Sequence, residues 1–161
     1  MIRRARPTDT RTILDFIRAL AVYEKLESQL EVDEQRLHEH LFGAEPACGA
    51  LVAEADGAPA GFALFYRTYS TFKTMPCMHL EDLFVLPQHR GKGLGLGLLR
   101  ALAAEAVAQG CPRLDWNVLD WNEPAIGFYR QQGAVVLPDW RTCRLEGAAL
   151  HALASRGAAG V

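Results

Sequence analysis

The sequence predicts an α/β fold in which a mixed central sheet carries helices on both faces. Segments with apolar residues at helical spacing, such as residues 94–109, alternate along the chain with apolar runs of strand length, such as residues 49–55. Turn-forming residues separate these segments, for example at Gly110-Cys111-Pro112. A chain of 161 residues has the length of one domain with a continuous core, so we expect residues 1–161 to form a single domain.

Five elements are expected in the first half of the chain. Thr8 or Asp9 can cap the first helix, on which Ile13 and Ile17 belong to one apolar stripe. The tetrapeptide Asp56-Gly57-Ala58-Pro59 between two apolar runs is typical of a hairpin turn. In chain order, we expect a strand over residues 2–5, helices over 9–26 and 33–41, and strands over 49–55 and 61–69.

The second half of the chain is expected to contain two helices, four strands and a tail. Asn122 is a good N-cap for the shorter helix, Pro124 suits its first turn, and Gly133 suits the left-handed position after its last turn. Residues 147–161 are rich in alanine and glycine and are expected to form a weakly ordered helical tail. The expected strands cover residues 78–86, 113–119, 134–137 and 140–146, the last two as a terminal β-hairpin, and the expected helices cover 94–109 and 123–132.

Residues Arg90-Gly91-Lys92-Gly93-Leu94-Gly95 lie between a predicted strand and a predicted helix and have the character of a phosphate-binding loop. Glycines allow backbone N–H groups to approach an anion, and the start of a helix supplies unpaired donors and a partial positive charge. Arg90 and Lys92 add full positive charges. The sequence therefore predicts a ligand that carries a pyrophosphate group.

Two of three common phosphate loops do not match this segment. A Walker A loop requires Lys followed by Ser or Thr, whereas Gly93 follows Lys92. The dinucleotide fingerprint G-x-G-x-x-G is out of register, and the next acidic residue, Asp115, falls near the start of a strand instead of at its end. A nicotinamide or flavin site is therefore disfavoured. The third form, Gln/Arg-x-x-Gly-x-Gly/Ala, is matched by Arg90-x-x-Gly93-x-Gly95.

This loop and a second segment together resemble the GNAT superfamily of acetyl-CoA-dependent N-acetyltransferases. The second segment, residues 119–134, is similar to the superfamily's block of strand, Asn, helix, Tyr and Gly, with Asn122 and Tyr129 at matching positions. The run Leu80-Glu81-Asp82-Leu83-Phe84-Val85 and the pair Tyr23-Glu24 further resemble the diamine (spermidine/spermine-type) acetyltransferase branch and its bacterial relatives. The resemblance covers nearly the whole chain.

The resemblance implies a GNAT-like fold with splayed central strands, acetyl-CoA as co-substrate, no metal, and a homodimer in which the terminal hairpin offers an edge for pairing. It also assigns roles to individual residues. Catalysis is assigned to Glu81 and Tyr129; coenzyme binding to Leu83, Phe84, Val85, Arg90, Gly91, Lys92, Gly93, Leu94, Gly95, Leu96, Asn122, Pro124, Ala125 and Tyr129; and amine binding to Tyr23, Glu24, Glu81, Asp82 and Asp139.

The implied chemistry is direct transfer of the acetyl group in a ternary complex. Only a neutral amine attacks a thioester, so Glu81 would accept a proton from the substrate ammonium through water. Backbone N–H groups near Phe84 would hold the oxyanion, and Tyr129 would protonate the departing thiolate. A regularly alternating strand places His79 and Glu81 on one face of the sheet and Asp82 on the other.

The same residues also have structural interpretations. Taken alone, Glu81 is compatible with an ion-paired strand end, and Tyr129 with a core aromatic whose hydroxyl is satisfied. Cys77 and His79 form a pair that, without further ligands, is far more often structural than metal-binding. A non-catalytic acyl-CoA-binding module that regulates a partner would keep the glycine loop without needing Glu81 or Tyr129, and it is the alternative to an enzyme.

Clustered carboxylates suit a cationic amine substrate. The polyamine enzymes have Asp and Trp ahead of the central strand, at positions where this chain has Ser70 and Phe72. A distal cationic contact is therefore weaker, which favours a short diamine, a lysine analogue or another small primary amine over a long polyamine. An acid-tagged substrate could use Arg67 or Lys73.

The composition disfavours several other partners. With 17 basic and 19 acidic residues, the net charge is −2, which gives no basic footprint for nucleic acid or a membrane surface. The basic N-terminus leads into Pro7-Thr8-Asp9, without an apolar signal core or a membrane-length apolar stretch, so we expect a cytoplasmic protein. The four cysteines are expected to be reduced thiols in the core: Cys48, Cys77, Cys111 and Cys143.

Overall fold

A computed structural model describes residues 1–156 of the chain, and the last part of the predicted tail, residues 157–161, lies outside the described residues. The chain forms two compact units, Met1–Asn117 and Val118–Val161. The first unit holds the sheet with three α-helices, and the described part of the second holds two α-helices. The association of these two units in one domain, expected from the chain length, stays a prediction.

The sheet of the first unit has five strands in the order β1-β2-β3-β4-β5. The first three neighbouring pairs are antiparallel and the pair β4 and β5 is parallel, so the predicted mixed sheet is confirmed. The left-handed pair Asp56 and Gly57, with φ of 52° and 78°, makes the tight turn expected between β2 and β3. The strands are β1 (Ile2–Arg4), β2 (Gly49–Ala55), β3 (Ala58–Ser70), β4 (Met75–Val85) and β5 (Leu114–Trp116).

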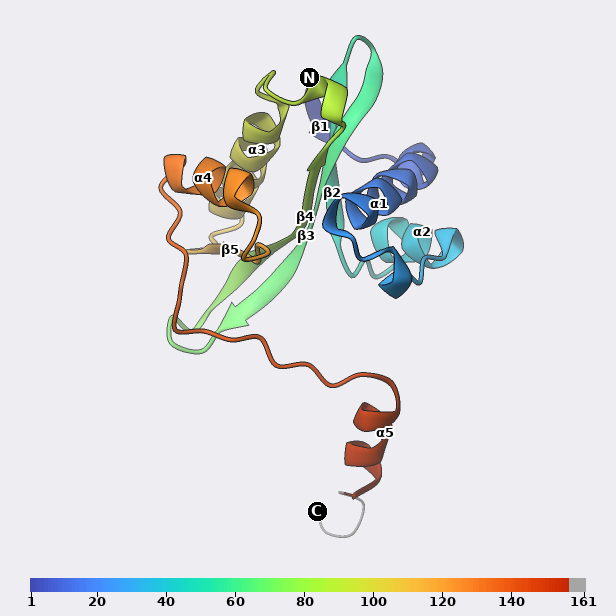
Figure 1. Ribbon diagram of the computed structural model, residues 1–161, viewed down its shortest axis with the longest axis vertical. Coiled ribbons are helices and arrows are strands. Elements are labelled where there is room, and N and C mark those ends of the chain that lie inside the picture. The colour runs from blue at the N-terminus through green and yellow to red at the C-terminus, as the bar shows by residue number, and fades with distance from the viewer. Residues whose placement is uncertain (157–161) are drawn as a thin grey trace. The chain divides into compact units, whose positions relative to one another are not determined.

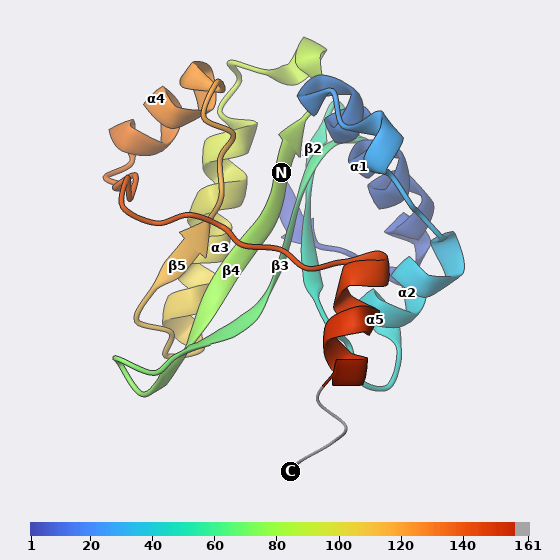
Figure 2. The ribbon, with the colours of Figure 1, turned by 60° about the horizontal axis from the view of Figure 1, so that its bottom comes forward.

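Helices cover both faces of this sheet, as predicted. α1 (Thr10–Glu24) and α2 (Glu34–Phe42) lie on one face, and α3 (Leu94–Ala108) lies on the other (Figures 1 and 2). Three short 3₁₀ helices join these elements: η1 (Pro7–Asp9), η2 (Glu27–Gln29) and η3 (Pro87–His89).

An aromatic cluster fixes α1 against the centre of the sheet. Phe16 of α1 stacks on Phe62 of β3 at 5.8 Å between ring centroids and lies 6.2 Å from Phe84 of β4. Ile13 and Leu20 extend the same buried stripe along the helix, which repeats at the spacing that one helix face requires. This packing holds the end of α1, with Tyr23 and Glu24, beside β4.

Asp9 stands at the N-cap position of α1, as one of the two predicted alternatives, but its side chain does not cap that helix. Its carboxylate instead accepts two hydrogen bonds from the Arg3 guanidinium, at 2.7 and 2.9 Å, and one from the Arg6 N–H at 2.7 Å. Arg3 also donates to Glu54 at 2.6 Å. The hydrogen bonds from Arg3 hold the pKa of Asp9 below its usual value. This charge cluster ties β1, β2 and α1 together.

The pairing of β4 with β5 is shorter than the sequence predicts. Residues 113–119 were expected to form a strand, but β5 covers only Leu114–Trp116 and pairs with Met78, His79 and Leu80. β4 continues for five more residues to Val85. The two strands therefore separate beyond Leu80, which confirms the splayed central strands.

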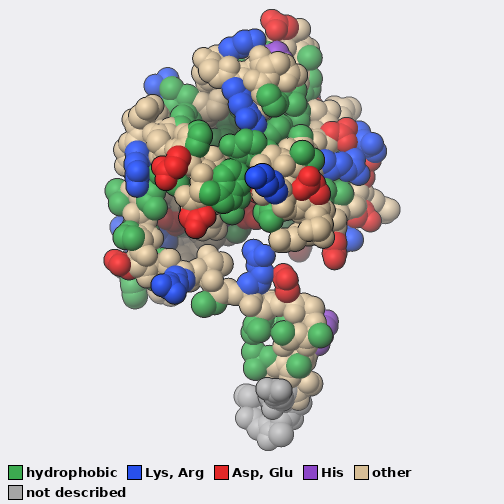
Figure 3. All heavy atoms as spheres, viewed as in Figure 1, with side chains coloured by type: hydrophobic (Ala, Val, Ile, Leu, Met, Phe, Trp, Pro, Cys, Tyr) green, Lys and Arg blue, Asp and Glu red, His purple; other side chains and the backbone are tan. Residues whose placement is uncertain are grey.

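The second unit contains α4 (Glu123–Gln131) and α5 (Gly147–Arg156). The predicted caps of α4 are present: the Asn122 side chain accepts a hydrogen bond from the Ala125 N–H at 3.3 Å, and Gly133 has a φ of 87°. α5 is the helix expected in the tail. Its Leu150 and Leu153 are exposed, and hydrophobic side chains are visible on its surface in Figure 3.

The predicted terminal β-hairpin is wrong for the described part of the chain. Residues 134–146 run as an extended segment with one turn between α4 and α5, without a strand (Figure 1). Apolar residues such as Val135, Leu137 and Trp140 made this segment resemble strands, yet these side chains are exposed. A strand is stable only when its backbone groups find a ladder partner, and an apolar pattern alone does not supply one.

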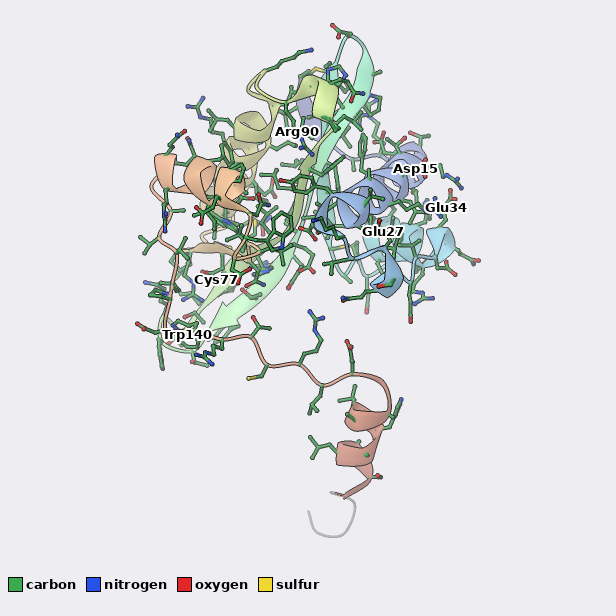
Figure 4. The ribbon with its side chains drawn as sticks, in the orientation of Figure 1. Asp15, Glu27, Glu34, Cys77, Arg90 and Trp140 are labelled. Atoms are coloured by element: carbon green, nitrogen blue, oxygen red, sulfur yellow. The ribbon has the colours of Figure 1, made fainter. Side chains whose placement is uncertain are left out.

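Charges and thiols are distributed largely as expected. Lys and Arg side chains lie among Asp and Glu side chains on the face seen in Figure 3, and Arg11 bridges Asp15 and Glu34 between α1 and α2 (Figure 4). All four cysteines are free thiols; Cys77 and Cys111 are buried, whereas Cys143 is exposed, so its assignment to the core was wrong. No helix within residues 1–156 combines the length and apolar character needed to cross a membrane.

Candidate active site

The predicted phosphate-binding loop joins β4, through η3, to the start of α3. Gly91 and Gly93 have φ of 73° and 80°, and Gly93 is the N-cap of α3. Neither glycine has an atom within 4 Å of the position that a Cβ would take, so the space over the loop is open. No side chain of the described residues caps this helix start, which leaves the first-turn N–H groups of residues 94–96 to a ligand or solvent.

The loop is accessible and carries positive charge, as a pyrophosphate site requires. Residues Arg90 to Gly93 are exposed, and Leu94, Gly95 and Leu96 are half-buried behind them. Lys92 adds a full charge to the partial positive charge of the helix start. Backbone N–H groups are the main source of donors at this helix start, and the binding of a pyrophosphate by the loop stays a prediction.

Arg90 makes contacts that the sequence did not predict. Its Nε donates a hydrogen bond of 3.0 Å to the carbonyl oxygen of Val85, at the end of β4. Its guanidinium lies 4.7 Å from the ring centroid of Tyr23 and 5.7 Å from that of Phe84, within the range of cation–π attraction. Figure 4 shows Arg90 at one end of β4 and Cys77 toward the other. Arg90 thus links the loop to the predicted amine-binding residue Tyr23.

A β-bulge interrupts β4 at Glu81. Phe65 pairs with Leu80 and the next residue back along β3, Leu64, pairs with Asp82, so Glu81 is an extra residue on β4. Because paired residues share a face, Asp82 lies on the face of Leu64, toward α1. His79 pairs with Tyr66 on that same face. The prediction that Asp82 lies on the opposite face from His79 and Glu81 is therefore wrong, since it assumed regular alternation.

The bulge gathers three carboxylates near the end of α1. Burial, together with the nearby charges of Glu81 and Glu24, raises the pKa of Asp82 to about 7. Burial also raises the pKa of Glu24. Glu24, Glu81 and Asp82 are thus electrostatically coupled. They are three of the four predicted amine-binding residues of the first unit, and the fourth, Tyr23, lies one residue before Glu24 at the end of α1.

Glu24 and Asp82 open into a cavity of about 180 Å³ whose other walls are mostly apolar. A cavity of this size accommodates a short aliphatic chain, and its two carboxylates suit a positive charge on that chain. The cavity is lined by Ile17, Leu20, Ala21, Glu24, Leu26, Gln29, Leu30 and Asp82.

Tyr66 and His79 adjoin Glu81 on the α1 side of the sheet. Their ring centroids are 5.1 Å apart, and the His79 Nε2 lies 3.9 Å from the Glu81 Oε2. Burial, the charge of Glu81 and a hydrogen bond with Glu81 raise the pKa of the Tyr66 phenol. The sequence pattern did not reveal this group, because it depends on the register between β3 and β4. Within residues 1–156, no cluster of three His, Cys, Asp or Glu side chains is arranged to hold a metal ion.

The predicted oxyanion strand, Leu83 to Val85, pairs with β3 on one edge only. Its partners there are Ala63, Phe62 and Gly61, while the pairing with β5 has already ended. A Cβ on Gly61 would lie 2.5 Å from the Phe84 carbonyl oxygen, so this close pairing requires glycine. The other edge of this stretch is where backbone groups can bind an acyl-coenzyme A arm.

The remaining predicted residues belong to the second unit. Asn122, Pro124 and Ala125 form the start of α4, and Tyr129 is buried on the same helix, 5.2 Å from the Phe128 ring. Asp139 is exposed in the extended segment after α4. The assembly of Tyr129 and Asn122 with the residues of β4 in one site stays a prediction.

The first unit thus has a glycine loop at a helix start, a splayed strand that ends beside it, and carboxylates on that strand and at the end of α1. These features are the ones expected of an acyltransferase that uses a coenzyme A thioester. The acetyltransferase (GNAT) family matches residues 18–134, and the chain belongs to this family. The match includes the loop, β4 and α4, so the predicted fold and enzyme class are confirmed. Members of this family use acetyl-CoA as co-substrate, and the chain is an acetyl-CoA-dependent N-acetyltransferase.

Several characterised relatives match most of the chain. A thialysine N-epsilon-acetyltransferase of Bos taurus is 39% identical, with 97% of this chain and 98% of that protein aligned. An L-ornithine N5-acetyltransferase of Arabidopsis thaliana is 32% identical over 94% of this chain and 86% of that protein. A human spermidine/spermine N(1)-acetyltransferase-like protein is 31% identical over 84% of this chain and 20% of that protein. These relatives confirm the resemblance to the diamine acetyltransferase branch.

A solved structure supports the same fold. An integron cassette protein from the mobile metagenome of V. cholerae superposes with a TM-score of 0.77 at 30% identity, covering 96% of each chain.

Proposed function

We propose that this enzyme transfers the acetyl group of acetyl-CoA to the terminal primary amine of a short cationic substrate, such as a lysine analogue, ornithine or a short diamine. The observation that carries the proposal is the small cavity between α1 and β4, in which Glu24 and Asp82 face otherwise mostly apolar walls. The relatives named for thialysine and ornithine act on amines of this size.

Long polyamines fit less well. They require a second anionic contact far from the reacting amine, and the predicted position for it is Ser70 at the end of β3. The Ser70 Oγ accepts a hydrogen bond of 3.3 Å from the Lys73 N–H within the turn to β4, and it carries no charge. Phe72 in that turn is 97% exposed, so its ring does not line a substrate cavity.

The proposed reaction starts from the neutral amine. An aliphatic amine with a pKa near 10.4 is about 0.04% neutral at pH 7, so the site must accept a proton. Glu81 accepts it through water, and the amine nitrogen attacks the acetyl carbon of acetyl-CoA. Backbone N–H groups near Phe84 bind the oxyanion, the C–S bond breaks, and Tyr129 protonates the thiolate.

Coenzyme binding is proposed for the loop, the free edge of β4 and the start of α4. The loop residues 90–96 would hold the pyrophosphate, and Leu83 to Val85 would bind the pantetheine arm. Asn122, Pro124 and Ala125 would bind from α4, which requires the two units to act as one domain. The family match from residue 18 to 134 crosses the boundary between the units and supports this association.

A cytoplasmic homodimer is also part of the proposal. Free thiols suit a reducing compartment. The exposed apolar residues of the segment 134–146, among them Val135, Leu137 and Trp140, suit burial against a second copy. Light scattering of the purified protein should give twice the chain mass of 17.7 kDa.

Replacement of Glu81 by Gln tests the proposed base. We expect kcat for a short diamine to fall by about 10²–10⁴, because Gln cannot accept the proton. Glu27→Gln is the matched control, since Glu27 is an exposed acid on η2 after α1 (Figure 4). Equal turnover of the two variants would remove Glu81 from the chemistry.

A further inference from the structure

Glu81 is an exposed base that needs a fixed orientation. Its side chain is 53% exposed, and the negative charges of Asp82 and Glu24 lie on the side of α1. Like charges repel, so an unrestrained Glu81 carboxylate would turn away from these neighbours toward solvent. A base that turns away is no longer near the ammonium that Glu24 and Asp82 attract.

His79 and Tyr66 are placed to restrain Glu81. The His79 side chain is only 15% exposed, and its Nε2 lies 3.9 Å from the Glu81 Oε2. Tyr66, its cross-strand partner, fixes the imidazole by ring contact at 5.1 Å. Glu81 also acts on the Tyr66 phenol, whose pKa it raises. The bulge at Glu81 creates this grouping, because it turns the carboxylate of an extra residue toward an aromatic pair.

We propose that His79 is a positioning residue for acetyl transfer: held by Tyr66, it donates its N–H to the Glu81 carboxylate and orients that carboxylate to receive the substrate proton. The proton that leaves the amine goes to Glu81, and His79 takes part in no bond that breaks or forms at the acetyl carbon. Catalytic hydrogen bonds often tighten when substrate binds, so a separation of 3.9 Å in the free enzyme suits this role. The inference rests on the proposed role of Glu81.

His79→Phe and His79→Gln separate orientation from packing. Phe keeps the ring contact with Tyr66 and loses the N–H, whereas Gln keeps a donor. We expect His79→Phe to lower kcat/KM for the amine by about 10–100-fold, the cost of a misplaced catalytic group, without a change in acetyl-CoA affinity. His79→Gln should recover most of that loss.

A double-mutant cycle with Glu81→Gln identifies the path of the effect. If His79 acts through Glu81, His79→Phe should cause no further loss in the Glu81→Gln background. An equal loss in both backgrounds would show a general structural role and overturn the inference. So would full activity of His79→Phe beside a strong loss in Glu81→Gln. Full activity of Glu81→Gln would instead overturn both the inference and the proposed base.

Tyr66→Phe provides a second test that does not depend on the folding of the His79 variants. It removes one oxygen atom and keeps the ring. We expect a loss of several-fold in kcat/KM that again disappears in the Glu81→Gln background. Activity equal to that of the unmodified enzyme would show that the Tyr66 phenol does not restrain Glu81.

Discussion

Asp82 is the residue at which burial and charge act most strongly. Its pKa of about 7 means that the carboxyl ionises near neutral pH, so the cavity gains a negative charge as the pH rises from 6 to 8. An ammonium substrate should therefore bind more tightly at pH 8 than at pH 6. The raised pKa depends on the burial of Asp82 and on its neighbours in the fold, so the sequence pattern does not reveal it.

Binding of a quaternary diamine analogue measures this charge without interference from titration of the amine. We expect its dissociation constant to fall as the pH rises through about 7, because Asp82 becomes ionised. Asp82→Asn should bind the analogue more weakly at pH 8 and show little pH dependence. Asp15→Asn, on the exposed side of α1, is the control and should keep the dependence.

The same ionisation affects stability. The folded-state pKa of Asp82 is above its usual value of 3.8, so its contribution to stability is full below about pH 3.8 and is lost as the pH rises through about 7. Asp82→Asn removes this cost. Chemical denaturation at pH 8 should show the variant more stable by at most about 4 kcal/mol, with the difference shrinking at pH 5. A less stable variant at pH 8 would contradict the raised pKa.

The proposed role of Tyr129 as the acid requires the two units to associate. Tyr129→Phe removes the proposed acid and keeps the buried ring, so kcat should fall by roughly 10²–10⁴ with little change in acetyl-CoA affinity. Steady-state kinetics with isothermal titration of acetyl-CoA separates the two quantities. Unchanged turnover would return Tyr129 to the role of a core aromatic.

Residue roles were predictable only where a local motif defines them. Asn122 and Gly133 follow from capping chemistry that involves a few neighbouring residues. The shared face of Glu81 and Asp82 does not follow from a local motif. It results from a bulge, which arises from the register between two strands and has no signal in the sequence. The contact of Arg90 with Tyr23 likewise joins residues far apart in the chain.

At the scale of elements, α3 allows a controlled test of the phosphate loop. Gly93 and Gly110 flank this helix, with φ of 80° and 69°, and a Cβ at either would meet no atom within 4 Å. Alanine at either position should cost about 1–2 kcal/mol from left-handed strain. Only Gly93→Ala places a methyl group in the open loop, so acetyl-CoA affinity should fall by about tenfold or more there alone.

Titration of acetyl-CoA into both glycine variants checks this prediction. Equal affinities in Gly93→Ala and Gly110→Ala would mean that the loop is not the pyrophosphate site. Both substitutions introduce similar backbone strain. A difference in acetyl-CoA affinity between the two variants therefore comes from the place of Gly93 in the loop and not from a general loss of stability.

Helices and paired strands were predicted well, since their patterns are local or are completed by a hairpin turn. α3 covers Leu94–Ala108 against a predicted 94–109, and β2 covers Gly49–Ala55 as predicted. The failures are β5, which is shorter than its apolar run, and the segment 134–146. In both cases the limit is set by whether a neighbouring strand is available, which depends on tertiary structure.

At the scale of the whole molecule, the account requires the two units to unfold together. Calorimetry should show one transition with equal calorimetric and van't Hoff enthalpies, because the proposed coenzyme site takes residues from both units. Acetyl-CoA at 100 times its dissociation constant should stabilise that transition by about 2.7 kcal/mol, whereas NAD should not. Two transitions, of which acetyl-CoA shifts only one, would separate the units.

Release of coenzyme A from acetyl-CoA, measured against a panel of amines, tests the central claim most directly. The panel contains putrescine, ornithine, lysine, thialysine, spermidine, spermine and small monoamines. The account predicts turnover with the short cationic amines, weaker turnover with spermine, and a higher KM for monoamines that lack a second charge for Glu24 and Asp82. Tight binding of acetyl-CoA without turnover of any amine would contradict the proposed function and favour an acyl-CoA-binding regulatory module.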